Sequence, residues 1–128
     1  WGTKYISKKE LASMEMKLDC FRKFVDMEFN RDKELLNQLL KENYSFHKIL
    51  SLAANNTYLN QLIANMDSIN NTIRDLYYDV SANDEIKISY EDHKRIFNAA
   101  KNGDCEEAEQ ATIDHIKRVA STIQKEFF

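Results

Sequence analysis

Apolar residues recur every three or four positions along most of the chain, the period of an amphipathic α-helix. Four breaks interrupt this repeat, so the pattern predicts five helices. The first is predicted to begin at Ser7, because Ser7 and Glu10 have the spacing of a capping box. Asp32 and Thr57 are suited to cap the second and third helices. The apolar repeat of the third helix extends to Tyr77.

The second half of the chain is predicted to hold one loop and two helices. Residues 81–87 have no apolar period and are predicted to be a loop, after which a short helix begins at Ser89. Gly103 suits the left-handed position that follows a helix end, and Asp104 is suited to cap the last helix. Because the connection at Gly103 is short, the last two helices should be antiparallel neighbours.

The composition agrees with an all-helical protein. The chain has only two glycines and no proline, whereas strand-rich folds need such residues in their turns. A length of 128 residues, with 43% hydrophobic and 30% charged residues, is typical of one globular domain. We therefore predict an all-α fold, an antiparallel bundle of about five helices.

Charge and cysteine content exclude several classes of function. The 18 basic and 21 acidic residues are mixed along the chain, so no basic run suggests binding of nucleic acid by this chain itself. No apolar stretch is long enough to span a membrane, and no signal peptide is visible. Cys20 and Cys105 are interpreted as reduced thiols of a cytoplasmic protein, since a disulfide would need an oxidising compartment.

All three histidines, His47, His93 and His115, lie in the apolar stripes of separate predicted helices, and Asn43 precedes His47 by one turn. A buried imidazole without a partner is costly, so a shared divalent metal ion would explain their placement. Three nitrogens and one amide oxygen suit zinc, nickel, iron or manganese better than calcium or magnesium.

An alternative interpretation stays open, because a single histidine on an apolar face is more often a core residue hydrogen-bonded to a carbonyl. Acidic residues also flank the histidines at Glu91, Asp92 and Asp114, but they point away from the apolar stripes. We expect these carboxylates to be solvated or to lie behind the metal ligands.

Several segments, in order along the chain, resemble the FCD domain, the FadR C-terminal type of effector-binding domain of GntR-family transcription regulators. They are Asn43–His47, Ala53–Asn56, Glu91–Ile96, Gly103-Asp104 with Ala108, and Asp114–Ile116. The family pattern is Asp or Asn, three residues, His, a long gap, His, 21 residues and His, and His93 and His115 have that final spacing. The resemblance covers roughly residues 7–125.

The resemblance implies an antiparallel helical bundle that encloses a metal ion and a small organic ligand, often a carboxylate. It assigns metal binding to His47, His93 and His115, and to Asn43 where many relatives have Asp. An amide is a weaker donor than a carboxylate, which bears on the affinity for the metal. Zinc is the first candidate, with nickel, manganese and iron as alternatives.

Open positions on such an ion would accept a carboxylate effector. Arg74 is a candidate to pair with its far end, and Tyr44 and Tyr77 are candidates to line the pocket. A plainer interpretation is that Arg74 is a solvated surface residue and that Tyr44 and Tyr77 are ordinary aromatic core residues.

The resemblance also implies a homodimer and DNA binding through an N-terminal winged-helix domain that this chain lacks. The helix with which the family domain usually opens also lies outside it, so either a second copy completes the bundle or the core is partly open. We expect residues 1–6 to be disordered or artificial and residues 7–128 to form the effector-binding domain.

Two other functions stay open. A metal-dependent hydrolase is one, because three histidines with an open coordination position also describe hydrolytic zinc. Such an enzyme needs a general base, and no acid lies on the stripes beside the histidines, which argues against catalysis. The other is a metal-free helical interaction domain.

Overall fold

A computed structural model describes residues 6–27, 33–54, 56–68, 72 and 83–127. These residues form five α-helices, and the prediction of an all-α fold is confirmed. The helices are α1 (Lys8–Met27), α2 (Lys33–Ala54), α3 (Thr57–Ser68), α5 (Asn83–Lys101) and α6 (Cys105–Phe127). None of the helices in these ranges is long and apolar enough to cross a membrane.

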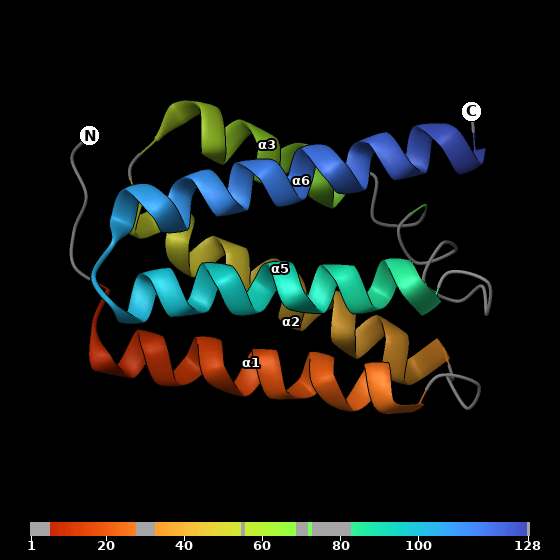
Figure 1. Cartoon of the computed structure of the whole chain (residues 1–128), viewed down its shortest axis with the longest axis horizontal. Helices are drawn as coiled ribbons and strands as arrows, with labels where there is room; N and C mark the ends of the chain where they lie inside the picture. The colour runs from red at the N-terminus through yellow and green to blue at the C-terminus, as the bar shows by residue number, and fades with distance from the viewer. Residues whose placement is uncertain (1–5, 28–32, 55, 69–71, 73–82, 128) are drawn as a thin grey trace.

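The helices form an antiparallel bundle (Figure 1). Helix α5 packs between α1 and α6 and runs antiparallel to both. Helix α2 packs against α1, α3 and α6, so that α2, α5 and α6 surround the centre of the bundle. The predicted antiparallel pairing of the last two helices is therefore confirmed.

The helix ends follow local hydrogen-bonding chemistry. The backbone N–H of Glu10 donates to Ser7 Oγ (3.1 Å) and that of Ser7 to Glu10 Oε1 (3.0 Å), which confirms the capping box. Gly103 has a φ of 76°, as the left-handed position after α5 requires. Asp104 Oδ1 accepts from the N–H of Glu107 (3.1 Å) and caps α6.

Two predicted boundaries are wrong. Helix α5 begins at Asn83, so residues 83–87, predicted to be a loop, are helical. The segment is polar, but Ile86 is fully buried, and Asp84 and Glu85 lie in the first turn, where carboxylates favour a helix N-terminus. Helix α3 is capped by Asn56 and not by Thr57, since Asn56 Oδ1 accepts the N–H of Leu59 (3.1 Å).

The core consists of two hydrophobic clusters. The first lies between α1, α2, α3, α5 and α6 and includes Phe21, Phe24, Leu36, Leu39, Leu59, Ile63, Ile86, Ile116 and Val119. The second includes Met14, Leu18, Phe46, Leu50, Ile96, Phe97, Ala108 and Ala111. Ile6 packs against the second cluster, while residues 1–5 are not among those described. The predicted cap Asp32 and the expected extension of the third helix to Tyr77 also lie outside the described residues.

Candidate metal centre

The side chains of His47 from α2, His93 from α5 and His115 from α6 converge between the two clusters. Their candidate ligand atoms all lie within 4.8 Å of one another. The ring centroids are 4.8 Å apart for His47 and His93, 5.3 Å for His47 and His115, and 4.5 Å for His93 and His115. The structure therefore brings together the three histidines that the helical spacing singled out.

This histidine cluster is shielded from water. The exposed fractions are 0% for His47, 2% for His93 and His115, and 5% for Asn43. Phe21 packs on His93 from α1, and Phe46 packs on both His47 and His93 (centroid distances 5.0–5.5 Å). Aromatic walls of this kind lower the local dielectric, so polar groups inside need partners.

Two of the imidazoles are fixed by hydrogen bonds on their outer nitrogens. His93 Nδ1 donates to the backbone oxygen of Ser89 (2.6 Å), and His115 Nδ1 donates to Asp92 Oδ2 (2.9 Å). Because a neutral imidazole carries a single N–H, both rings then hold a lone pair on Nε2.

Asn43 contacts the histidine cluster, whereas His47 has polar atoms without a partner among the described residues. Asn43 Oδ1 contacts His93 Nε2, yet an amide oxygen and an unprotonated nitrogen are both acceptors and cannot bond to each other. Only a proton donor or a cation could satisfy both, unless the Asn43 amide is rotated to present its NH₂ group. Both ring nitrogens of His47 are buried and have no hydrogen-bond partner among the residues that the structure describes.

Burial lowers the pKa of all three histidines. The pKa of His47 falls well below 6.5 and that of His93 falls to about 3, in both cases mainly through loss of hydration. Burial also lowers the pKa of His115, although the hydrogen bond and the charge of Asp92 act in the opposite direction. At neutral pH the rings are therefore uncharged, the form in which imidazole binds metal ions.

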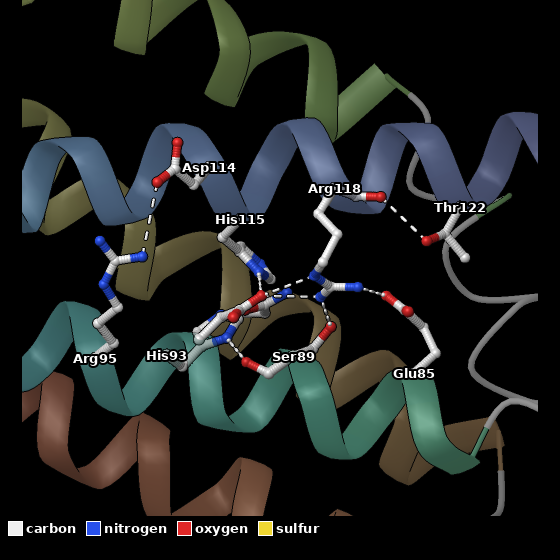
Figure 2. Close-up of polar contacts among 10 residues, drawn as sticks. Glu85, Ser89, His93, Arg95, Asp114, His115, Arg118 and Thr122 are labelled. Carbon is white, nitrogen blue, oxygen red and sulfur yellow. Dashed lines mark hydrogen bonds and ion pairs between the residues drawn. The ribbon is translucent and has the colours of Figure 1, made fainter.

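Behind the histidines lies a charged network between α5 and α6 (Figure 2). Arg118 reaches from α6 to Asp92 (2.9 Å), Glu85 (2.5 Å) and Ser89 Oγ (3.0 Å) on α5. Burial raises the pKa of Asp92, but hydrogen bonds and charge from His115 and Arg118 outweigh it and lower that pKa overall. Asp92 therefore lies behind His115, which is the second of the two positions that the sequence led us to expect for it.

Arg118 and Glu85 were not singled out from the sequence. The available signal was the spacing of Glu85, Ser89 and Asp92, which places three polar residues on one face of a helix, with Arg118 one turn after His115. Glu91 and Asp114, in contrast, are exposed and lie near Lys94 (3.7 Å) and Arg95 (3.6 Å), as expected for solvated acids.

The three candidate effector contacts are not brought to the histidine cluster by the described part of the structure. Tyr44 is partly buried and lines a groove of about 330 Å³ between α1 and α2, together with Lys17 and Lys48. Arg74 and Tyr77 lie outside the described residues.

Comparison with known proteins identifies the family. The family model described as the FCD domain matches residues 6–118, a range that includes Asn43 and all three histidines. Comparison with curated proteins and with solved structures gave no significant match. Domains of this family belong to transcription regulators, and the match covers most of the 128 residues. The chain is therefore a member of the FCD domain family.

Proposed function

We propose that this chain is the metal-binding, ligand-sensing and dimerisation domain of a GntR-type transcription regulator. His47, His93, His115 and Asn43 would hold one divalent metal ion, and a small carboxylate would be the effector. Binding of that effector would alter DNA binding by a separate winged-helix domain. Membership of the FCD family supports the regulatory context.

The observation that carries the metal site is the state of His47. Its two ring nitrogens are fully buried and unpaired within the described part of the chain, although His93 and His115 lie within ring-contact distance. Leaving a buried polar group without a partner costs about 1–3 kcal/mol. A metal ion shared with the other two imidazoles would give His47 a ligand bond and would remove this cost.

The donor set suits a transition metal. Neutral imidazoles and an amide oxygen match zinc first, with nickel, manganese and iron as alternatives. Zinc binds nitrogen at about 2.0–2.1 Å, which places two tetrahedral ligands about 3.4 Å apart, so nitrogens up to 4.8 Å apart would have to approach by up to about 1.4 Å. Asn43 would be a weaker donor than the Asp of many relatives, because its neutral amide attracts a cation less than a carboxylate does.

A bound ion would supply positive charge and open positions for a carboxylate oxygen. The three histidines would hold the ion in place, and Phe21 and Phe46 would exclude water from it. Arg74 would pair with the far end of the effector and Tyr77 would line its pocket, whereas Tyr44 lines the separate groove between α1 and α2. A homodimer would pass the change to the DNA-binding domains. For this, the effector would have to bind one conformation of the dimer more tightly than the other, because a ligand shifts an equilibrium only if it distinguishes the two states.

Metal content tests the site directly. Protein purified without added metal should contain about one equivalent of a transition metal per chain, or take it up after treatment with a chelator and dialysis against zinc. His47→Leu should lose most of this metal, while Arg95→Gln, a change on an exposed ion pair, should keep it. Content well below one equivalent after addition of zinc, nickel and manganese would contradict the metal site.

The effector is tested separately. A panel of small mono- and dicarboxylates should raise the melting temperature of the zinc-loaded protein more than that of the chelated protein. Arg74→Gln should weaken the response while leaving metal content unchanged. Equal responses with and without metal would argue against a carboxylate bound at the ion.

A further inference from the structure

We propose that Arg118 is a positioning residue of the histidine cluster, which fixes the orientation of His115 through Asp92 and supports His93 less directly through Ser89. Its guanidinium holds Asp92 and Ser89, and oxygen atoms of these two residues accept the Nδ1–H groups of His115 and His93. This inference rests on the proposed metal site, because it concerns how two of its ligands are held.

The geometry links one side chain to both rings. Arg118 Nε and Nη2 donate to Asp92 Oδ2 at 3.0 and 2.9 Å, the same oxygen that accepts from His115 Nδ1. Arg118 Nη2 also donates to Ser89 Oγ (3.0 Å), while the backbone oxygen of Ser89 accepts from His93 Nδ1 (2.6 Å). Figure 2 shows Arg118 reaching from α6 between Glu85 and the two histidines.

Glu85 anchors the arrangement at its outer end. Its Oε1 accepts from Arg118 Nη1 (2.5 Å), so all three nitrogens of the guanidinium donate, each toward α5. The planar fork of arginine fixes such directions, whereas the single ammonium of lysine cannot donate along all three. Two carboxylates and one guanidinium leave one net negative charge behind the imidazoles, which favours a cation among them.

Loss of Arg118 would release Asp92. The carboxylate of Asp92 is 27% exposed, so without the guanidinium it can turn toward water and away from His115. His115 would then lose the acceptor that keeps its proton on Nδ1 and its lone pair on Nε2. Partners behind metal-binding histidines typically change metal affinity by about 10–100-fold when removed.

A purely structural role predicts a different result, and the chain provides a matched control. Arg95 also joins α5 to α6, through Glu107 (2.5 Å) and Asp114 (3.6 Å), but it bonds to neither Asp92 nor Ser89. If Arg118 only clamps the two helices, then Arg118→Gln and Arg95→Gln should behave alike.

The test measures the zinc dissociation constant of the full chain by competition with a chelator of known affinity. Arg118→Gln should bind zinc about 10–100-fold more weakly than the unmodified protein, and Arg118→Lys should recover only part of the loss. Arg95→Gln should stay within about twofold. Equal zinc affinities for Arg118→Gln and Arg95→Gln would overturn the positioning role and leave the metal site standing. An unmodified chain that binds no zinc would overturn both.

A second measurement has its deciding outcome in the unmodified protein, so that outcome does not depend on how a variant folds. Long-range ¹H–¹⁵N NMR of the unmodified, metal-free protein reports which nitrogen of each imidazole carries the proton. His93 and His115 should both be protonated on Nδ1, and Arg118→Lys should shift His115 toward the Nε2-protonated form while leaving His93 less affected. His115 protonated on Nε2 in the unmodified protein would overturn the proposal.

Discussion

Replacing His47 with leucine should have opposite effects on stability with and without metal. Leucine is close to histidine in size, and it removes the two buried ring nitrogens that have no partner. In chelator, removal of the unsatisfied groups should raise the free energy of unfolding by about 1–3 kcal/mol. Imperfect packing against Phe46 and the other two histidines should subtract less than about 1.5 kcal/mol.

In zinc, the unmodified chain should be more stable than His47→Leu. At a zinc concentration 100 times its dissociation constant, a protein that binds the ion only when folded gains about 2.7 kcal/mol. The unmodified chain should show this gain and His47→Leu should lose most of it. For a chain of 128 residues, 1 kcal/mol corresponds to roughly 3–5 °C in melting temperature.

The assay is thermal unfolding by circular dichroism, in excess chelator and in zinc. His47→Gln is the matched control, because it removes the imidazole ligand but keeps buried polar atoms, so it should not gain stability in chelator. If His47→Leu is less stable than the unmodified chain by the same amount in both conditions, the nitrogens of His47 have partners in solution, and the argument from their isolation is refuted.

The remaining predictions use the same methods. His115→Ala should lower the melting temperature strongly in zinc but much less in chelator, and equal losses would mean that the ring acts only as core. Without metal, the pKa of His93 is about 3 in the folded chain, compared with 6.5 for an ordinary histidine. Between these pH values His93 is therefore protonated in the unfolded chain but not in the folded chain. The contribution of His93 to stability should therefore change little above pH 6.5 and fall below it by up to about 1.4 kcal/mol per pH unit, with His47 and His115 adding to the loss; urea unfolding curves that coincide at pH 7 and pH 5 would contradict this. Gly103→Ala should cost about 1–2 kcal/mol, because Gly103 has a φ of 76°, whereas Gly103→Asn should cost less; an unchanged urea midpoint for the alanine variant would contradict this.

The positions of the three histidines could be predicted because helical spacing is regular. His47, His93 and His115 each fall on an apolar face, and the short turn at Gly103 forces α5 and α6 to run antiparallel. Spacing along a helix fixes which side a residue occupies, and the core can accept only one side of each helix. The meeting of the rings follows from these two constraints.

The charged network behind the rings could not be predicted in the same way. The bonds of Arg118 to Glu85 and Asp92 depend on the rotation of α5 about its axis relative to α6, which the apolar pattern fixes only coarsely. The start of α5 was missed for a related reason. Residues 83–87 contain a single strongly apolar side chain, Ile86, and the turn is helical partly because Glu85 has a tertiary partner in Arg118.

Of two helix caps, one could be predicted from the sequence and the other could not. The reciprocal bonds of Ser7 and Glu10 were predictable because both partners belong to one short motif. Asn56 and Thr57 are adjacent and both are suited to cap α3, so the sequence alone does not choose between them. Asn56 also contacts Glu109 on α6, a tertiary interaction that favours it and that no local pattern contains.

The enclosure of the histidine rings would control how quickly an ion is exchanged. Because no more than 2% of any of these side chains is exposed, an ion among them could leave only when neighbouring helices separate locally. Its residence time would then follow the opening rate of the bundle and not the strength of its ligand bonds alone. An effector that binds at the ion would need the same local opening to reach it, so effector binding and metal exchange would share one gate in the motion of the bundle.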